Sequence, residues 1–131
     1  NDDGICLLHT IGSVDSPSPP QTWIQKRIFP GGIVPSLSDM VIPIEKTGLI
    51  ISDCETLIHH YDKTLKAWLD RFIQNKEKAK YMHGNEFVRM WEFYLASCSA
   101  AFKFKDLVVY QLQLVKKFTA PPSNRRNYMY Q

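Results

Sequence analysis

Two long segments with apolar residues at helical spacing constrain most strongly what this chain can fold into. In residues 60–80, aromatic and aliphatic side chains recur every three or four positions, and residues 86–102 repeat the pattern. This spacing places the apolar side chains of each segment on one face of an α-helix. The sequence therefore predicts two consecutive amphipathic helices, with a break at Gly84. The stripes are Tyr61, Leu65, Trp68, Leu69, Phe72 and Ile73, then Phe87, Trp91, Tyr94, Leu95, Cys98 and Phe102.

Three apolar runs outside these helices predict strands. Residues 5–8 form a short continuous run that is typical of a strand buried on both faces. Residues 49–57 are rich in isoleucine, and residues 107–115 place glutamines on one face. A shorter helix is expected before the second strand, with Ser36 as its cap and Pro43 bending or ending it. The order strand, helix, strand, helix, helix, strand predicts an α/β fold.

The remaining segments are predicted to be loops. Residues 13–22 are dense in proline and serine, which favours a surface loop, and the tail 119–131 is expected to be loosely held. Pro30-Gly31-Gly32 predicts a tight turn. Two interpretations of that turn stay open: a structural turn that needs glycine, or a gate that carries Trp23 and Phe29 to a membrane surface.

Composition narrows the classes of function. The net charge of +3 is too small to indicate a nucleic-acid partner, although it is compatible with an anionic lipid surface. The three cysteines, Cys6, Cys54 and Cys98, include no CxxC pair, which indicates a reducing compartment. No apolar run approaches the ~20 residues that span a bilayer. These features predict a cytoplasmic protein.

Spacing alone assigns no chemistry to the chain. It contains no glycine-rich phosphate loop, no HExxH and no GxSxG. His59 and His60 are adjacent, so their side chains diverge on a helix or a strand and no metal site is predicted. By pattern alone, this is an α/β domain without an assigned function.

Four sequence motifs, which occur in a fixed order along the chain, indicate more about function than spacing does. Together they resemble the C-terminal half of the family of cyclopropane-fatty-acyl-phospholipid synthases and mycolic acid cyclopropane synthases, over residues 4–116. The motifs are Leu8-His9-Thr10-Ile11-Gly12; Ile28-Phe29-Pro30-Gly31-Gly32 with Pro35-Ser36; His60-Tyr61 with Thr64-Leu65 and Trp68; and Arg89-Met90-Trp91 with Tyr94-Leu95.

The resemblance implies a class I S-adenosylmethionine-dependent methyltransferase fold, a Rossmann-like sheet whose last strand is antiparallel. Residues 5–9 would form the fifth strand and residues 49–57 the sixth. Residues 107–115 would form the seventh strand, inserted between them. Residues 1–118 would then be the C-terminal part of the catalytic domain, and residues 119–131 a tail.

The resemblance also implies a reaction. The family transfers a methylene group from S-adenosylmethionine to a cis double bond of an acyl chain, and the last step removes a proton from a carbocation. A bound bicarbonate serves as the base, and the matching residues are His9, the backbone N–H of Ile11, and Tyr94. His9 and Tyr94 are thus the candidate catalytic residues. Such donors suit a small anion, which must be hydrogen-bonded when it is buried.

The glycine-rich loop and the acidic residue that hold S-adenosylmethionine are expected upstream, so no cofactor-binding residue is assigned here. This part alone is expected to be inactive. The implied substrate is a membrane phospholipid, reached by peripheral contact at the inner face of the membrane, and a homodimer is compatible with the sequence. One alternative is a truncated, non-catalytic product that binds lipid or a partner. Others are a generic α/β interaction domain, and methylation without ring closure.

Overall fold

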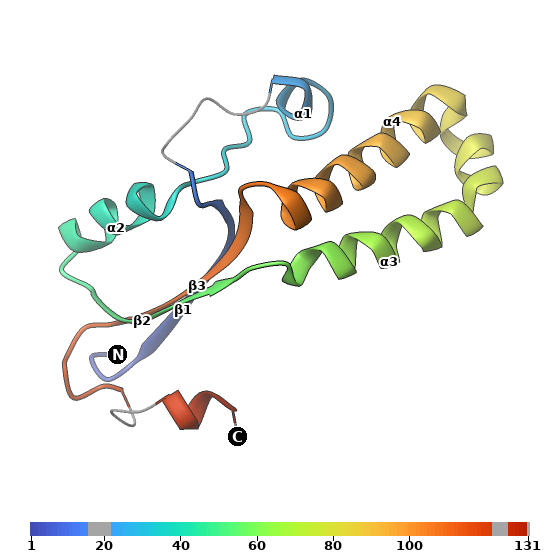
Figure 1. Cartoon of the computed structure of the whole chain (residues 1–131). Coiled ribbons are helices and arrows are strands. Elements are labelled where there is room, and N and C mark those ends of the chain that lie inside the picture. The colour runs from blue at the N-terminus through green and yellow to red at the C-terminus, as the bar shows by residue number, and fades with distance from the viewer. Residues whose placement is uncertain (16–21, 122–125, 131) are drawn as a thin grey trace.

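The computed structural model describes residues 1–15, 22–121 and 126–130, and most of the predicted proline-rich loop lies outside them. In chain order, two helices follow the first strand and two more follow the second (Figure 1). The elements are β1 (Ile5–Ser13), α1 (Thr22–Arg27), α2 (Leu37–Lys46), β2 (Ile50–Leu57), α3 (His60–Gln74), α4 (Lys76–Phe104), β3 (Leu107–Val115) and the 3-10 helix η1 (Arg126–Tyr130).

The three strands form one sheet in the order β1-β3-β2. β3 runs antiparallel to both neighbours, so the last strand of the chain is inserted between the two earlier ones. This confirms the predicted strands and their order. β1 is longer than predicted, because it continues through the His9 motif to Ser13.

α2 covers one face of the sheet. Its predicted start is confirmed: the Ser36 side chain accepts from the backbone N–H of Asp39, and the Asp39 carboxylate accepts from that of Ser36. Pro43 does not end the helix, which continues to Lys46 before the left-handed Gly48. The apolar core beneath the helix consists of Met40, Ile44, Val108, Tyr110, Leu112 and Leu114.

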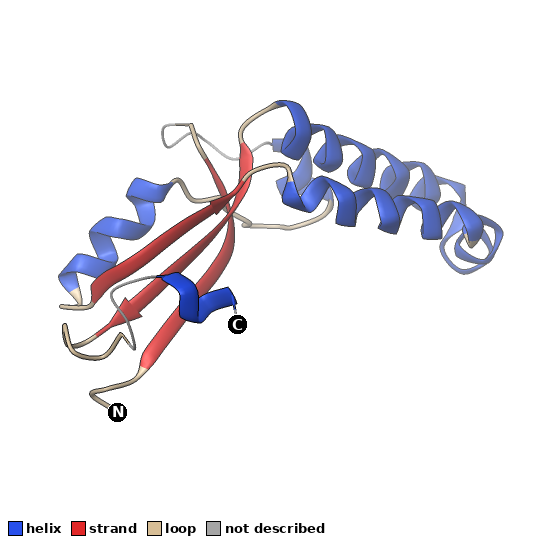
Figure 2. Ribbon diagram, turned by 60° about the horizontal axis from the view of Figure 1, so that its bottom comes forward, coloured by secondary structure: helices blue, strands red, loops and turns tan. Residues whose placement is uncertain are grey.

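α3 and α4 form a helical hairpin that extends from one end of the sheet (Figure 2). The predicted break at Gly84 is confirmed, since this residue has φ 82° and ψ 171° within α4. The predicted end of the first helix was wrong: α3 ends at Gln74, not near residue 80. The Asn75 side chain donates to the Arg71 carbonyl at 2.8 Å and satisfies an exposed helix end. An ion pair of 2.8 Å between Lys76 and Glu92 links the start of α4 to its later part.

β1 was predicted to be buried on both faces, and in this chain it is not. Ile5 and Leu7 are 45% and 61% exposed. β1 lies at the edge of the sheet, where among the described strands it pairs only with β3. α2 covers only the face that carries Leu8.

This edge predicts self-association. An unpaired strand edge with exposed apolar side chains is a template for pairing with another chain. We expect the 131-residue chain to self-associate in sedimentation velocity, and Leu7→Lys to reduce the association. Ile42→Lys, a matched change on α2 where Ile42 is also exposed, should leave it unchanged. A concentration-independent monomer with a cooperative thermal melt would contradict this expectation.

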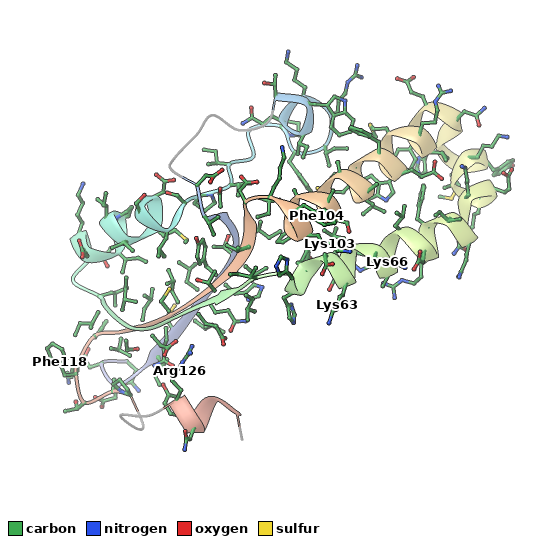
Figure 3. The ribbon with its side chains drawn as sticks, in the orientation of Figure 1. Lys63, Lys66, Lys103, Phe104, Phe118 and Arg126 are labelled. Carbon is green, nitrogen blue, oxygen red and sulfur yellow. The ribbon has the colours of Figure 1, made fainter. Side chains whose placement is uncertain are left out.

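The tail was predicted to be loosely held, and its described part makes contacts with the sheet. Arg126 forms an ion pair with Asp53 at 2.7 Å and approaches Glu55 at 3.8 Å. The Tyr128 hydroxyl donates to the Gln113 side chain at 2.9 Å. Figure 3 shows Arg126 beside the sheet, on the side away from α2. The tail therefore covers part of the second face of the sheet.

Candidate active site

The C-terminal half of β1 presents the His9 motif on the face opposite α2. Side chains alternate along a strand, and Leu8 packs into the core beneath α2. His9 and Ile11 therefore share the other face, and both are exposed. The side-chain amide nitrogen of Gln111 on β3 lies 3.2 Å from Nδ1 of His9.

The backbone of β1 supplies a donor at the same place. The N–H of Val14 donates to the Asp106 carbonyl next to β3, and the N–H of Ser13 donates in the opposite direction, to the Pro35 carbonyl. Successive N–H groups of a strand point to alternate edges. The N–H of Ile11 therefore points away from β3, as that of Ser13 does. It is directed to the open edge of the sheet, where an anion could accept its hydrogen bond.

Gly12 leaves no space for a side chain on the face of the sheet that α2 covers. A Cβ there would lie 2.4 Å from Cδ2 of Tyr110 and 2.9 Å from the Pro35 carbonyl oxygen. The Tyr110 hydroxyl donates to the Ser13 carbonyl at 3.1 Å. The glycine of the motif is therefore required by packing, because the Tyr110 ring occupies the space of a side chain.

Tyr94 lies half-buried on α4. Its ring meets that of Trp91 at 5.1 Å and that of Phe29 at 5.9 Å between centroids. Burial raises the pKa of Tyr94 to about 12, with smaller contributions from Cys98, which shares a hydrogen bond with it, and from Tyr61. The phenol is thus protonated at neutral pH and is able to donate a hydrogen bond.

The position of Tyr94 relative to His9 follows from the residues of β3 that lie between them. Tyr94 packs against the hairpin cluster that includes buried Val109, and Val109 lies directly opposite Ile11. Opposed residues of two strands share a face. Tyr94 therefore belongs to the cluster at the Ile11 end of the face that carries His9. Among the described contacts none joins Tyr94 to His9, so their convergence on one anion stays a prediction.

The donor chemistry fits a small oxyanion. An imidazole N–H, a backbone N–H and a phenol O–H all donate, and none carries a negative charge at neutral pH. An anion placed among them would be satisfied in an environment that is apolar on the side of α4. These three groups therefore have the donor chemistry that a small oxyanion requires.

The Pro30-Gly31-Gly32 turn brings aromatic residues onto α4. Gly31 has φ 74°, a conformation that favours glycine. Phe29 contacts Tyr94, and Trp23 meets Phe93 edge-on at 4.9 Å. Trp23 on α1 and Phe29 after it remain partly exposed. The turn thus has a structural role next to Tyr94.

Trp68 and Trp91 line a shallow, open depression on the surface of the hairpin, together with Arg71, Phe72 and Leu95. Both tryptophans belong to the predicted apolar stripes, but Trp68 remains 40% exposed. Trp91 is more enclosed and stacks on Phe87 with centroids 5.7 Å apart.

The two tryptophans are expected to differ in their contribution to stability. We expect Trp91→Ala to lower the free energy of unfolding of the full-length protein by ~3–5 kcal/mol, as for a packed aromatic residue. The matched change Trp68→Ala should cost less, about 1–2 kcal/mol, because that side chain is less buried. Denaturant titration measures both. Lost activity at unchanged stability in Trp91→Ala would show that this ring serves the substrate instead of the fold.

Within the described ranges no three His, Cys, Asp or Glu side chains lie close enough together to hold a metal ion. The helices among these residues are also too short or too polar to cross a membrane.

Gln111 is a residue that the motifs did not single out. Its signal was present as one of two glutamines on one face of a largely apolar strand. Alternation places it on one face of β3, but only the strand register reveals that it lies opposite His9.

Comparison with known proteins gives a consistent result. A tuberculostearic acid methyltransferase of Mycobacterium tuberculosis is 44% identical over 104 residues, covering 78% of this chain and 24% of the relative. The cyclopropane-fatty-acyl-phospholipid synthase of Escherichia coli is 34% identical over 110 residues, covering 84% of this chain and 28% of the relative. The chain thus spans about a quarter of the length of these curated relatives.

Solved structures agree with these relatives. A mycolic acid cyclopropane synthase complexed with SAH and CTAB matches with a TM-score of 0.74 and 27% identity, covering 85% of this chain and 44% of that chain. The family model described as mycolic acid cyclopropane synthetase matches residues 1–112. The chain therefore belongs to the mycolic acid cyclopropane synthetase family, whose members use S-adenosylmethionine to transfer methyl or methylene groups to lipids, and it has the methyltransferase fold of that family.

Proposed function

We propose that this chain is the C-terminal part of a cyclopropane-fatty-acyl-phospholipid synthase and supplies the base site of the reaction. The whole enzyme transfers a methylene group from S-adenosylmethionine to a cis double bond of a phospholipid acyl chain. The observation that carries the proposal is the end of β1, where the His9 side chain lies on the face that carries the Tyr94 cluster and the Ile11 N–H points away from β3.

In this proposal each residue has a defined role. His9 and Ile11 donate to the anion from β1, and Tyr94 donates from α4. Bicarbonate, when bound there, supplies the base that accepts the proton released as the ring closes. The apolar cluster around Tyr94 limits access of water, which strengthens hydrogen bonds at the site. S-adenosylmethionine is held by residues outside this chain.

The test is turnover by the full-length protein. It is incubated with S-adenosylmethionine carrying a labelled methyl group and with vesicles of a phospholipid that has cis-monounsaturated acyl chains. Mass spectrometry and proton NMR of the released fatty acids should show one added CH₂ group within a three-membered ring. A methyl branch instead of a ring would contradict cyclopropanation. Lipid binding without any methyl transfer would favour the non-catalytic alternative.

Peripheral membrane contact is part of this proposal. The segment expected to make it is α1 together with the Pro30-Gly31-Gly32 turn that follows it. Trp23 and Phe29 are partly exposed, and aromatic side chains favour the membrane interface. We expect the double change Trp23→Ser and Phe29→Ser to weaken binding of the full-length protein to anionic vesicles in a co-sedimentation assay. The matched change of exposed Tyr81 on α4 to Ser should have no effect. Equal binding by all three proteins would assign the turn a purely structural role.

A further inference from the structure

We propose that Gln111 is a positioning residue for His9, whose imidazole it holds in the tautomer that carries the proton on Nε2. The amide nitrogen of Gln111 lies 3.2 Å from Nδ1 of His9. An amide nitrogen only donates, so Nδ1 accepts the hydrogen bond and the proton of a neutral imidazole is on Nε2. The inference rests on the function proposed above, because there the Nε2–H donates to the anion.

The pairing is set by the rigid sheet. His9 and Gln111 are directly opposite partners in the β1–β3 ladder. The hydrogen bond from the Val14 N–H to the Asp106 carbonyl fixes the alternation of that ladder, which makes His9 and Gln111 a non-hydrogen-bonded pair. The side chains of such pairs lie closest together. The backbone of two strands thus aims the amide at the imidazole.

The two glutamines of β3 have different partners, which distinguishes the role of Gln111 from that of Gln113. Apart from its two glutamines the strand is almost entirely apolar and mostly buried, and Gln111 itself is partly buried. The second glutamine, Gln113, is bound by Ser52 at 2.8 Å and by Tyr128 at 2.9 Å. Those contacts tie β2 and the tail to the sheet. Gln111 instead contacts the candidate catalytic histidine.

The chain offers a matched pair of variants. Gln111→Glu keeps the shape of the side chain but replaces the amide donor with a carboxylate, which only accepts. It should draw the proton of the imidazole to Nδ1 and remove it from Nε2. Gln113→Glu makes the same change two residues along the same face, next to Ser52 and Tyr128, and should leave His9 unaffected.

The experiment is nitrogen-15 NMR of the full-length protein labelled at histidine, with His9→Gln used to assign the His9 signal. We expect the proton on Nε2 in the wild type and in Gln113→Glu, and on Nδ1 in Gln111→Glu. A wild-type His9 protonated on Nδ1 overturns the inference, whether or not the variants fold. The spectra do not depend on turnover, so they remain informative if the proposed function fails.

Kinetics give a second readout. By analogy with residues that orient catalytic histidines through a hydrogen bond, Gln111→Glu should lower kcat on the order of 10- to 100-fold. The KM for S-adenosylmethionine should not change, since its site lies outside this chain. Gln113→Glu should retain wild-type kcat. Equal kcat values in both variants would overturn the positioning role.

Discussion

Replacing His9 with alanine in the full-length enzyme is expected to lower turnover by about 10²- to 10⁴-fold, the range over which proton-transfer catalysis contributes. The change removes one of the three donors that we propose for the anion. Stability should change by less than ~1 kcal/mol, because His9 is exposed and its side chain bonds only to Gln111 among the described contacts. Lipid product formation and a thermal melt measure the two effects.

The control for His9 is its neighbour. Thr10→Val alters a side chain on the same strand that points toward α2, so turnover should be retained. Tyr94→Phe removes a second donor but keeps the ring contacts with Phe29 and Trp91. It should slow turnover without impairing folding, and added bicarbonate should stimulate the wild type more than this variant. Full turnover in His9→Ala would exclude the imidazole from the chemistry.

Gly12→Ala is expected to destabilise the full-length protein by about 3 kcal/mol or more, at the upper end of the costs of overpacking. The new Cβ would lie 2.4 and 2.5 Å from two atoms of the Tyr110 ring. That ring is buried in the core beneath α2, and its hydroxyl is bound to the Ser13 carbonyl, so it has little freedom to move aside.

Gly4→Ala provides the comparison for Gly12. Its Cβ would approach only Asn1, whose carbonyl oxygen would lie at 3.2 Å, so a change of less than ~1 kcal/mol is expected. Denaturant titration of both variants measures the difference. Equal stabilities would mean that β1 and β3 do not pack as closely as the structure shows.

The sequence predicted the features that depend on local chemistry. Ser36 followed by Asp39 specifies a helix start through hydrogen bonds within one turn, and Gly84 specifies a break through its left-handed backbone. The order of the strands came from the family resemblance, because nothing local to β3 indicates that it lies between β1 and β2.

The sequence-based predictions that were wrong mostly concern which other elements pack against a helix or strand. An apolar stripe shows which face of a helix avoids water but not which element meets it, so it did not indicate that Trp68 is partly exposed. The same reason applies to Leu7 on β1. The end of α3 depends on one side-chain cap, Asn75, which the longer apolar pattern obscured. Gln111 was placed on the correct strand, but its partner follows only from the register.

The central claim is that His9, the Ile11 N–H and Tyr94 hold one anion. A crystal structure of the full-length enzyme with bicarbonate measures this directly. We predict that Nε2 of His9, the backbone nitrogen of Ile11 and the Tyr94 hydroxyl each lie ~2.7–3.2 Å from an oxygen of the same planar anion. A Tyr94 hydroxyl that faces solvent, far from His9, would contradict the account.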